Sequence, residues 1–231
     1  MCGRKTLTMS KKAIIEELMV DEWQVKDYTP SYNIAPTQHS LVLVKERGYN
    51  IVKSMRWGLI PVWSKNELYG SKMINARLET VTTKPSFKNL IPKNRCIVLS
   101  NGYYEWKQSG GKKEPFFIQR KGGGLMFFAG LWTTWSVPSK RIFTYTILTT
   151  KAQKDISTIH DRMPVLIDKS KAEIWINLDN QFPEVELALT EIEEALSYYQ
   201  VSDFVNKPNN NSVACIAPFK ASNMPSLFED D

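Results

Sequence analysis

Cys2, the second residue of the chain, is where the sequence points most directly to chemistry. If Met1 is removed, Cys2 carries a free α-amine and a thiol on adjacent carbons. An unperturbed α-amine has a pKa of roughly 7.7–8.0 and a thiol one of about 8.5, so the amine is the more available nucleophile near neutral pH. This pair suits an aldehyde, because the amine condenses to a Schiff base and the sulfur then closes a five-membered thiazolidine. A second-position cysteine also occurs by chance, so both interpretations stay open.

Two other residues could transfer protons. Glu105 lies in NGYYEWK, where burial among the aromatic neighbours would raise its pKa towards neutrality; an edge-strand carboxylate facing water is the alternative. His160 lies in STIHDRMPVLI and is either a structural histidine or a general acid or base. Cys2, Glu105 and His160 are separate residues without ligand-pair spacing. We therefore expect no metal.

Arginines recur beside aromatic and small polar residues. Arg4 stands near the start of the chain, Arg56 in MRWGLIPVW, Arg77 in INARLET and Arg162 in HDRMP. Guanidinium groups pair with phosphates through parallel hydrogen bonds, and exposed aromatic faces stack on unpaired bases. The sequence shows no helix-turn-helix, zinc-finger or glycine-rich phosphate-loop pattern. The arginines thus favour single-stranded nucleic acid, with a solvated basic surface as the alternative.

The formal charge of +6 is unevenly distributed along the 231 residues. Residues 1–171 hold 28 basic and 13 acidic residues (net +15), whereas residues 172–231 hold 2 basic and 11 acidic residues (net −9). A basic body is typical of proteins that bind polyanions, with nucleic acid as the first candidate. We expect the acidic segment to pack away from a DNA groove, where its charge would repel nucleic acid.

Composition predicts a soluble, intracellular protein. Hydrophobic residues make up 42% of the chain and charged residues 23%, which is typical of globular proteins. No stretch approaches the ~20 apolar residues of a membrane span, and the N-terminal residues lack the apolar block of a signal peptide. Three cysteines without CxxC spacing indicate neither a disulfide framework nor a zinc knuckle. Cys96 and Cys215 lie in apolar runs typical of buried thiols.

The apolar patterning predicts one α+β domain over residues 1–219, with a large, mainly antiparallel β component. It predicts an amphipathic helix over 10–19 with Ser10 as N-cap, a short helix over 170–177 and a longer acidic helix over 183–199. Short helices and loops are expected over 71–90, a loop over 206–211 and a C-terminal tail over 220–231. The predicted strands are 41–46 and 49–54, which form a hairpin, then 95–100, 114–120, 124–135, 141–150 and 212–219.

Seven segments of the chain coincide, in order, with one family. They are MCGR at the start, YNIAPTQ (32–38), RWGLIPVW (56–63), INARLET (74–80), SNGYYEWK (100–107), FAGLW (128–132) and IHDRMPVLI (159–167). Together they resemble the SOS response-associated peptidase family, and the similarity covers residues 1–219. No single motif is decisive, but their joint order is highly specific. The resemblance implies a single domain of mainly antiparallel strands with flanking helices.

The resemblance also implies a function in the DNA damage response. Members of the family bind single-stranded DNA, trap the ring-opened aldehyde of an abasic site and shield it as a covalent thiazolidine crosslink. By resemblance, Cys2 is the nucleophile, Asn75 orients the Cys2 terminus or the sugar, Glu105 moves protons during Schiff-base formation, and His160 assists sugar ring opening and crosslink reversal. The implied DNA-binding residues are Arg4, Arg77, Arg162, Pro36, Trp63 and Thr149. No metal or organic cofactor is implied. We expect a cytoplasmic monomer, associated with the nucleoid if bacterial.

Two other functions stay open on the sequence. One is a thiol peptidase, as the family name implies, in which Cys2 becomes the nucleophile after removal of Met1 or of a longer leader. The other is a non-catalytic single-strand binding module in which Cys2 is incidental. A strand-cleaving lyase activity through the Schiff base is a side activity of the crosslinking function.

Overall fold

The large sheet of the computed structural model closes on itself. The structure describes residues 2–190 and 195–219, so the predicted tail over 220–231 lies outside the described residues. Along its main path the sheet runs β12 (Arg162–Pro164), β11 (Lys140–Lys151), β10 (Met126–Val137), β7 (Arg95–Ser100), β4 (His39–Glu46), β5 (Tyr49–Trp57) and β2 (Glu22–Trp23). β11 pairs antiparallel with β10 and also parallel with β5. This second pairing joins β5, β11, β10, β7 and β4 into a barrel-like ring.

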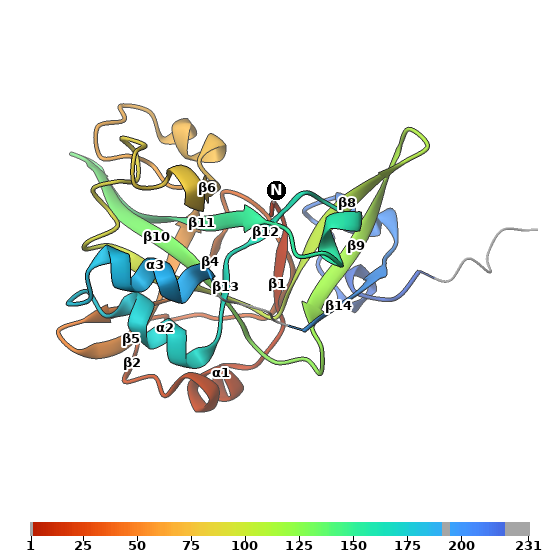
Figure 1. Cartoon of the computed structure of the whole chain (residues 1–231), viewed down its shortest axis with the longest axis horizontal. Helices are drawn as coiled ribbons and strands as arrows, with labels where there is room; N and C mark the ends of the chain where they lie inside the picture. The colour runs from red at the N-terminus through yellow and green to blue at the C-terminus, as the bar shows by residue number, and fades with distance from the viewer. Residues whose placement is uncertain (1, 191–194, 220–231) are drawn as a thin grey trace, which may run out of the picture.

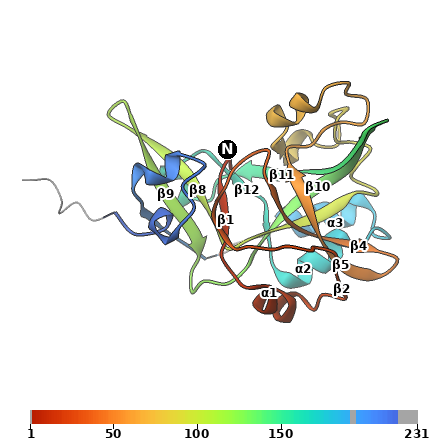
Figure 2. The same cartoon turned by 180° about the vertical axis from the view of Figure 1, so that it is seen from behind.

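Short strands and a second sheet flank this ring. β6 (Asn75–Arg77) pairs with β11, and β13 (Leu166–Ile167) pairs with β10. The second sheet has the order β14 (Leu196–Gln200), β9 (Lys112–Arg120), β8 (Gly102–Ser109), β1 (Lys5–Leu7) and β3 (Ser31–Ile34). In both views β1 lies between β8 and the ring, and the β8–β9 hairpin projects from the body (Figures 1 and 2). The start of the chain is therefore enclosed by β structure.

The helices are α1 (Lys11–Leu18), α2 (Lys169–Ile176) and α3 (Phe182–Thr190). Short 3-10 turns cover Glu67–Lys72, Leu78–Thr80, Ile156–Thr158, Asp203–Asn206 and Val213–Cys215. The main apolar cluster joins Ile14 of α1 and Trp175 of α2 to the strands of the ring and to Cys2. The fold is thus mostly antiparallel strands with few helices, built around one main core.

Local sequence signals explain the N-terminal elements. The Ser10 side chain accepts a hydrogen bond from the Ala13 N–H at 3.2 Å and caps α1, which confirms the predicted helix. The predicted hairpin is confirmed as β4 and β5, joined at Arg47 and Gly48. Both joining residues have positive φ (52° and 86°), the conformation that a two-residue hairpin turn requires.

Two predicted C-terminal elements are wrong. The helix predicted over 183–199 ends as α3 at Thr190, and residues 196–200 form β14 on the edge of β9, with residues 191–194 outside the described part. Tyr199 packs on Phe117 at 5.7 Å between ring centroids, so tertiary pairing overrides the helical periodicity here. The strand predicted over 212–219 is a 3-10 turn followed by one β-bridge, between Val201 and Pro218. Proline has no N–H to continue a ladder.

Arg95 links the ring to α2. Its side chain is almost fully buried (1% exposed) and donates to four backbone carbonyls. The acceptors are Ile91 (2.9 Å), Asn180 (3.1 Å), Trp175 and Asn177. One guanidinium therefore satisfies the carbonyls around the C-terminal end of α2 and the turn before β7.

Replacing Arg95 with Leu should destabilise the fold by about 4 kcal/mol, because several buried carbonyls lose their donor. Urea denaturation measures this loss. Arg141→Leu, at an exposed position near the start of β11, is the matched control and should change stability by less than about 0.5 kcal/mol. Equal stability of the two variants would show that Arg95 is not a structural link.

Candidate active site

Cys2 is fully buried at the start of the chain. It has no exposed surface and belongs to the main apolar cluster. The Asn75 side chain donates from Nδ2 to the Cys2 carbonyl at 2.7 Å. Asn75 reaches this position because β6 pairs with β11 at Ile147. Its Oδ1 is buried and has no hydrogen-bond partner within the described residues, so it can accept from a bound molecule.

Glu105 lies beside Cys2 because of the register between β1 and β8. The Tyr104 N–H donates to the Arg4 carbonyl at 3.0 Å, so the next residue along β8 faces the residues that precede β1. Glu105 is 2% exposed. Burial raises the pKa of Glu105 to about 7, and the Asp161 carboxylate adds to the rise. A carboxyl group with this pKa can give or take a proton near neutral pH.

The same burial keeps the Cys2 thiol protonated. Desolvation raises the pKa of Cys2 well above its usual range, and the charge of Glu105 raises it further. A buried, protonated thiol is a poor first nucleophile. Any reaction at Cys2 that begins with nucleophilic attack therefore starts from another group, and the α-nitrogen is the one next to it.

His160 faces Glu105 across a cleft. It stands between the 3-10 turn Ile156–Thr158 and β12, and its side chain is 27% exposed. The Arg162 N–H donates to His160 Nδ1 at 3.0 Å, and Asp161 Oδ1 lies 2.8 Å from the same nitrogen. A neutral ring accepts the Arg162 N–H, whereas a ring protonated at Nδ1 donates to Asp161 instead. Partial burial lowers the pKa of His160, which favours the neutral, proton-accepting form.

Two cavities flank the start of the chain. The cleft has a volume of about 680 Å³ and is lined by Glu105, Trp106, Gln108, Lys113, Ile159, His160, Asp161 and Asn206. A pocket of about 460 Å³ is lined by Asn75 and Arg77 of β6, and also by Tyr69 and Lys84. β6 and β8 lie on opposite sides of the start of the chain in both views (Figures 1 and 2). Cys2 therefore lies between the cleft and the pocket.

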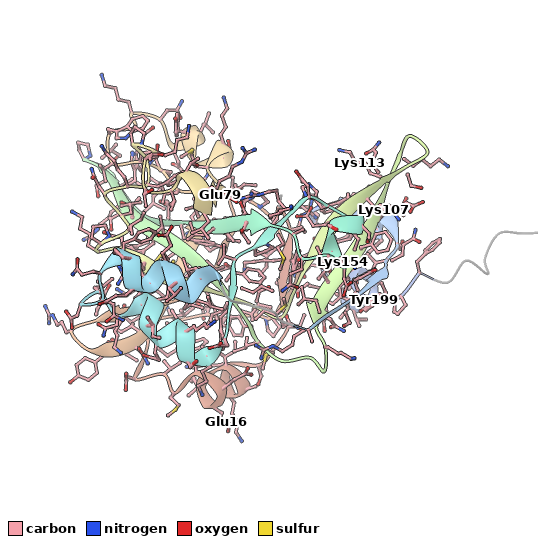
Figure 3. All side chains as sticks on the ribbon, in the orientation of Figure 1. Glu16, Glu79, Lys107, Lys113, Lys154 and Tyr199 are labelled. Atoms are coloured by element: carbon pink, nitrogen blue, oxygen red, sulfur yellow. The ribbon has the colours of Figure 1, made fainter. Side chains whose placement is uncertain are left out.

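The predicted DNA-binding arginines differ in their surroundings. Arg77 is exposed at the pocket. Arg162 makes a two-point ion pair with Glu79 (2.7 and 2.9 Å), and Glu79 is labelled below the uppermost lobe in Figure 3. Arg4 is part-buried and donates to Asn33 Oδ1 at 2.7 Å and to the Val205 carbonyl at 2.8 Å. Arg4 thus holds the C-terminal turns against the second sheet.

The other three predicted DNA-binding residues, Pro36, Trp63 and Thr149, also differ in exposure. Trp63 is 56% exposed and packs edge-on against Tyr69 at 5.3 Å between centroids, and Pro36 is half-buried before β4. The prediction that Thr149 contacts DNA directly does not fit its position, because its side chain is fully buried. The Thr149 carbonyl accepts from Arg162 at 2.6 Å, so Thr149 positions that arginine instead.

Comparison with known proteins identifies the family. The sequence profile of the SOS response associated peptidase (SRAP) family matches residues 1–208. The chain belongs to this family. The resemblance carried by the seven sequence segments is thereby confirmed.

Relatives and solved structures cover nearly the whole SRAP chain. It is 42% identical over 217 residues to the abasic site processing protein YoqW of Bacillus subtilis strain 168. This match covers 92% of the present chain and 97% of YoqW. It is 32% identical over 226 residues to the abasic site processing protein HMCES of Gallus gallus, a match that covers 84% of this chain and 67% of HMCES. A crystal structure of a Bacteroides thetaiotaomicron protein matches with a TM-score of 0.83 at 25% identity. The match covers 95% of this chain and 100% of that protein's chain. The crystal structure of a phage-related protein from Bordetella bronchiseptica matches with a TM-score of 0.70 at 27% identity. This match covers 87% of the present chain and 94% of the Bordetella chain.

Sequence reasoning missed several residues of this SRAP site. Glu79 lies in INARLET two residues after Arg77, and Asp161 lies in IHDRMPVLI between His160 and Arg162, so the motifs contained their signal. Lys84 lines the pocket but carries no motif. Within the described residues, no group of three or more His, Cys, Asp or Glu side chains could hold a metal ion, and no helix there is long and apolar enough to cross a membrane.

The acidic helix α3 lines neither cavity. It carries Glu184 and Glu186 and packs against α2 and β13. No described residue of α3 lines the cleft or the pocket. Another part of the acidic segment does reach the cleft, because Asn206 lines it at the end of the 3-10 turn that begins at Asp203.

The raised pKa of Glu105 predicts a pH-dependent cost to stability. Because the pKa of Glu105 is about 7 in the folded state, its protonated carboxyl stabilises the fold fully at pH values below the pKa of the unfolded state. This contribution is lost as the pH rises through 7. Glu105→Gln should therefore stabilise the protein relative to the wild type at pH 8, by up to about 3 kcal/mol, and much less at pH 4.5. Urea denaturation at the two pH values checks this. Glu16→Gln, an exposed residue of α1, should show no such difference.

Proposed function

We propose that this chain processes abasic sites in single-stranded DNA by forming a covalent thiazolidine crosslink through Cys2. The observation that carries the proposal is the grouping of Cys2 with Asn75 and Glu105 between two cavities. Relatives at 42% and 32% identity are named abasic site processing proteins, which supports the same substrate class. An abasic nucleotide supplies the aldehyde that an adjacent amine and thiol can capture.

The first steps use the amine and Glu105. Removal of Met1 frees the Cys2 amine, and the Asn75 hydrogen bond to the Cys2 carbonyl fixes the orientation of that residue. His160 takes the proton of the sugar C1 hydroxyl as the bond from C1 to the ring oxygen breaks, and returns it to that oxygen, which becomes a hydroxyl as the aldehyde forms. The amine attacks the aldehyde carbon, and protonated Glu105 gives its proton to the departing hydroxyl, which leaves as water. The product is a protonated Schiff base (an iminium ion), with Glu105 left as a carboxylate.

Ring closure then involves the thiol. The sulfur adds to the Schiff-base carbon, the C=N electron pair returns to nitrogen, and a five-membered thiazolidine forms. The buried, protonated state of the thiol supports this order of steps, because the thiolate needed for a first attack is disfavoured. The Schiff base also permits strand cleavage by elimination, so we assign a lyase side activity to the same intermediate.

The two cavities suit the strand on either side of the lesion. Lys113 lines the cleft from the projecting β8–β9 hairpin (Figure 3), and Arg77 and Lys84 line the pocket. Cations on both sides of Cys2 fit phosphates that flank the abasic nucleotide. Trp63, edge-on to Tyr69 of the pocket, offers an exposed aromatic face to an unpaired base. Such a nucleotide needs no base flipping in a single strand.

The alternatives have less support. A thiol peptidase requires an activated thiolate, and burial with Glu105 raises the Cys2 pKa instead of lowering it. A non-catalytic binding module gives no reason for a carboxyl with a pKa of about 7 beside the chain start. All four residues of the proposed chemistry come from one chain, so we propose that it acts as a monomer.

Substitutions at Cys2 separate the steps. Wild-type protein freed of Met1 should form a heat-stable adduct with a single-stranded oligonucleotide bearing one abasic site, visible on a denaturing gel. Cys2→Ser keeps the amine, so it should form a borohydride-trappable Schiff base but no heat-stable adduct. Cys2→Ala should behave as Cys2→Ser does, and the intact mass confirms that Met1 has been removed from each protein. A heat-stable adduct from either variant would rule out the thiazolidine.

Charge removal at the pocket should weaken DNA binding in a salt-dependent way. Arg77→Gln and Lys84→Gln should each lower the affinity for single-stranded DNA and reduce the slope of log affinity against log salt by about 0.7, the value for one phosphate contact. Fluorescence anisotropy at salt concentrations from about 50 to about 200 mM gives both the affinity and its salt slope. Lys12→Gln, on exposed α1, is the matched control. An unchanged slope for both pocket variants would place the strand elsewhere.

A further inference from the structure

Lys5 is a buried ionisable residue outside the proposed catalytic set. Its side chain has no exposed surface. Nζ donates to the Leu99 carbonyl of β7 at 2.9 Å, and this is its only hydrogen-bond acceptor among the residues that the structure describes. An ammonium group has three donors, so burial with one acceptor favours the neutral amine. Burial lowers the pKa of Lys5 to about 7, which leaves both forms populated near neutral pH.

Strand register puts Lys5 on the face of the second sheet that carries the site. Lys5 is the cross-strand partner of Tyr103 on β8. Directly opposed residues of an antiparallel pair project from the same face, and residues two apart on one strand share a face. Glu105, two residues beyond Tyr103, therefore lies on this face as well. Lys5, Tyr103 and Cys2 have no exposed surface, and Glu105 is 2% exposed.

The groups around Lys5 connect it to the thiol. The charges of Lys5 and Cys2 interact, which lowers the pKa of the thiol and raises that of the amine. The Tyr103 hydroxyl is fully buried, and its oxygen has no hydrogen-bond partner within the described part of the chain. The remaining neighbours, Ile34 across β3 and Leu99 on β7, carry no titratable side chain. Cys2 is thus the titratable group whose charge acts on this amine, and Tyr103 is the cross-strand partner of Lys5.

We propose that Lys5 accepts the proton of the Cys2 thiol when the thiazolidine ring closes. This role rests on the proposed function, because ring closure requires the Schiff base. The S–H proton moves to the neutral amine of Lys5, the sulfur forms the C–S bond, and the C=N electron pair becomes the lone pair of the ring nitrogen. Lys5 is left as an ammonium.

The proton then returns to the group that supplied one earlier. Glu105 gave its proton to the departing water and is a carboxylate at this stage. Transfer from the Lys5 ammonium to the Glu105 carboxylate restores the neutral amine and the neutral acid, and Tyr103 stands opposite Lys5 and two residues before Glu105 on β8. Over the whole cycle, amine, aldehyde and thiol give thiazolidine and water with no net change in protons.

The test measures the two steps separately. Wild type and Lys5→Met, both freed of Met1, react with a single-stranded oligonucleotide carrying one abasic site. Borohydride quenching reports the Schiff base, and heating before the gel reports the thiazolidine alone. Lys5→Met should form the Schiff base within about twofold of the wild-type rate and close the ring about 100-fold more slowly. Lys12→Met, 86% exposed on α1, should match the wild type in both steps.

A pH profile distinguishes proton transfer from a structural role. The wild-type rate of ring closure should rise with pH through about 7 as Lys5 loses its proton, and Lys5→Met should lose this rise. Lys5→Arg keeps a donor for the Leu99 carbonyl but stays charged, so it should be as slow as Lys5→Met. Normal ring closure in Lys5→Met, equal slowing of both steps, or a fast Lys5→Arg would each overturn the proposal.

Folding and the proposed function are checked in the same series. A buried lysine with a lowered pKa loses folding stability as the pH falls towards 7, so Lys5→Met should melt at a higher temperature than the wild type at pH 6. If Lys5→Met does not fold, Lys5→Arg carries the same kinetic test. If the wild type gives no trapped Schiff base, the proposed function itself is contradicted. If the wild type gives a trapped Schiff base and Lys5→Met closes the ring at the wild-type rate, only the role of Lys5 is contradicted.

Discussion

Desolvation of the chain start is the constraint on which the rest of the site depends. β1 places Cys2 between the ring and the second sheet, where the residue has no exposed surface. The same burial raises the pKa of Glu105 to about 7 and lowers that of Lys5 to about 7. A carboxyl and an amine with ordinary values would both be charged at neutral pH. Burial brings them into the range where each can give or take a proton.

Closure of the ring supplies the opposite wall of the site. β11 pairs with β5 and also carries β6, so Asn75 is held by strand pairing instead of by a loop. The Asn75 amide can then fix the Cys2 carbonyl at 2.7 Å. Arg162, on β12 beside β11, is fixed by Glu79 and the Thr149 carbonyl. Groups that must meet a small aldehyde are thus mounted on rigid elements, which limits the motion lost on binding.

Sequence reasoning succeeded where the signal was local and failed where it was tertiary. The Ser10 cap and the Arg47–Gly48 turn are encoded within a few residues, and both elements formed as predicted. β14 depends on the free edge of β9, about 80 residues away in the sequence, and its acidic surroundings favoured a helix instead. The aromatic neighbours of Glu105 signalled its burial, and the residue is 2% exposed.

Other site features had no signal in a single sequence. Lys5 follows a basic residue at a polar chain start, and its burial depends on packing against β7, which the local pattern does not contain. Thr149 lies in β11 where residues 144–149 are all buried, so both faces of the strand are covered there. This burial depends on the strands and loops packed around β11, which the local sequence pattern does not contain. Strand positions therefore required the sheet topology, whereas the prediction of Cys2 as the nucleophile rested on residue type and position in the sequence alone.

The buried thiol also bears on selectivity. A protonated, inaccessible thiol reacts slowly with oxidants and with other electrophiles, because those reactions need the exposed thiolate. An aldehyde captured by the adjacent amine is different, since the Schiff base brings its carbon to the sulfur from inside the site. The thiol then needs only a nearby proton acceptor and no exposure to solvent. Burial thus suppresses side reactions of Cys2 while leaving the intramolecular ring closure available.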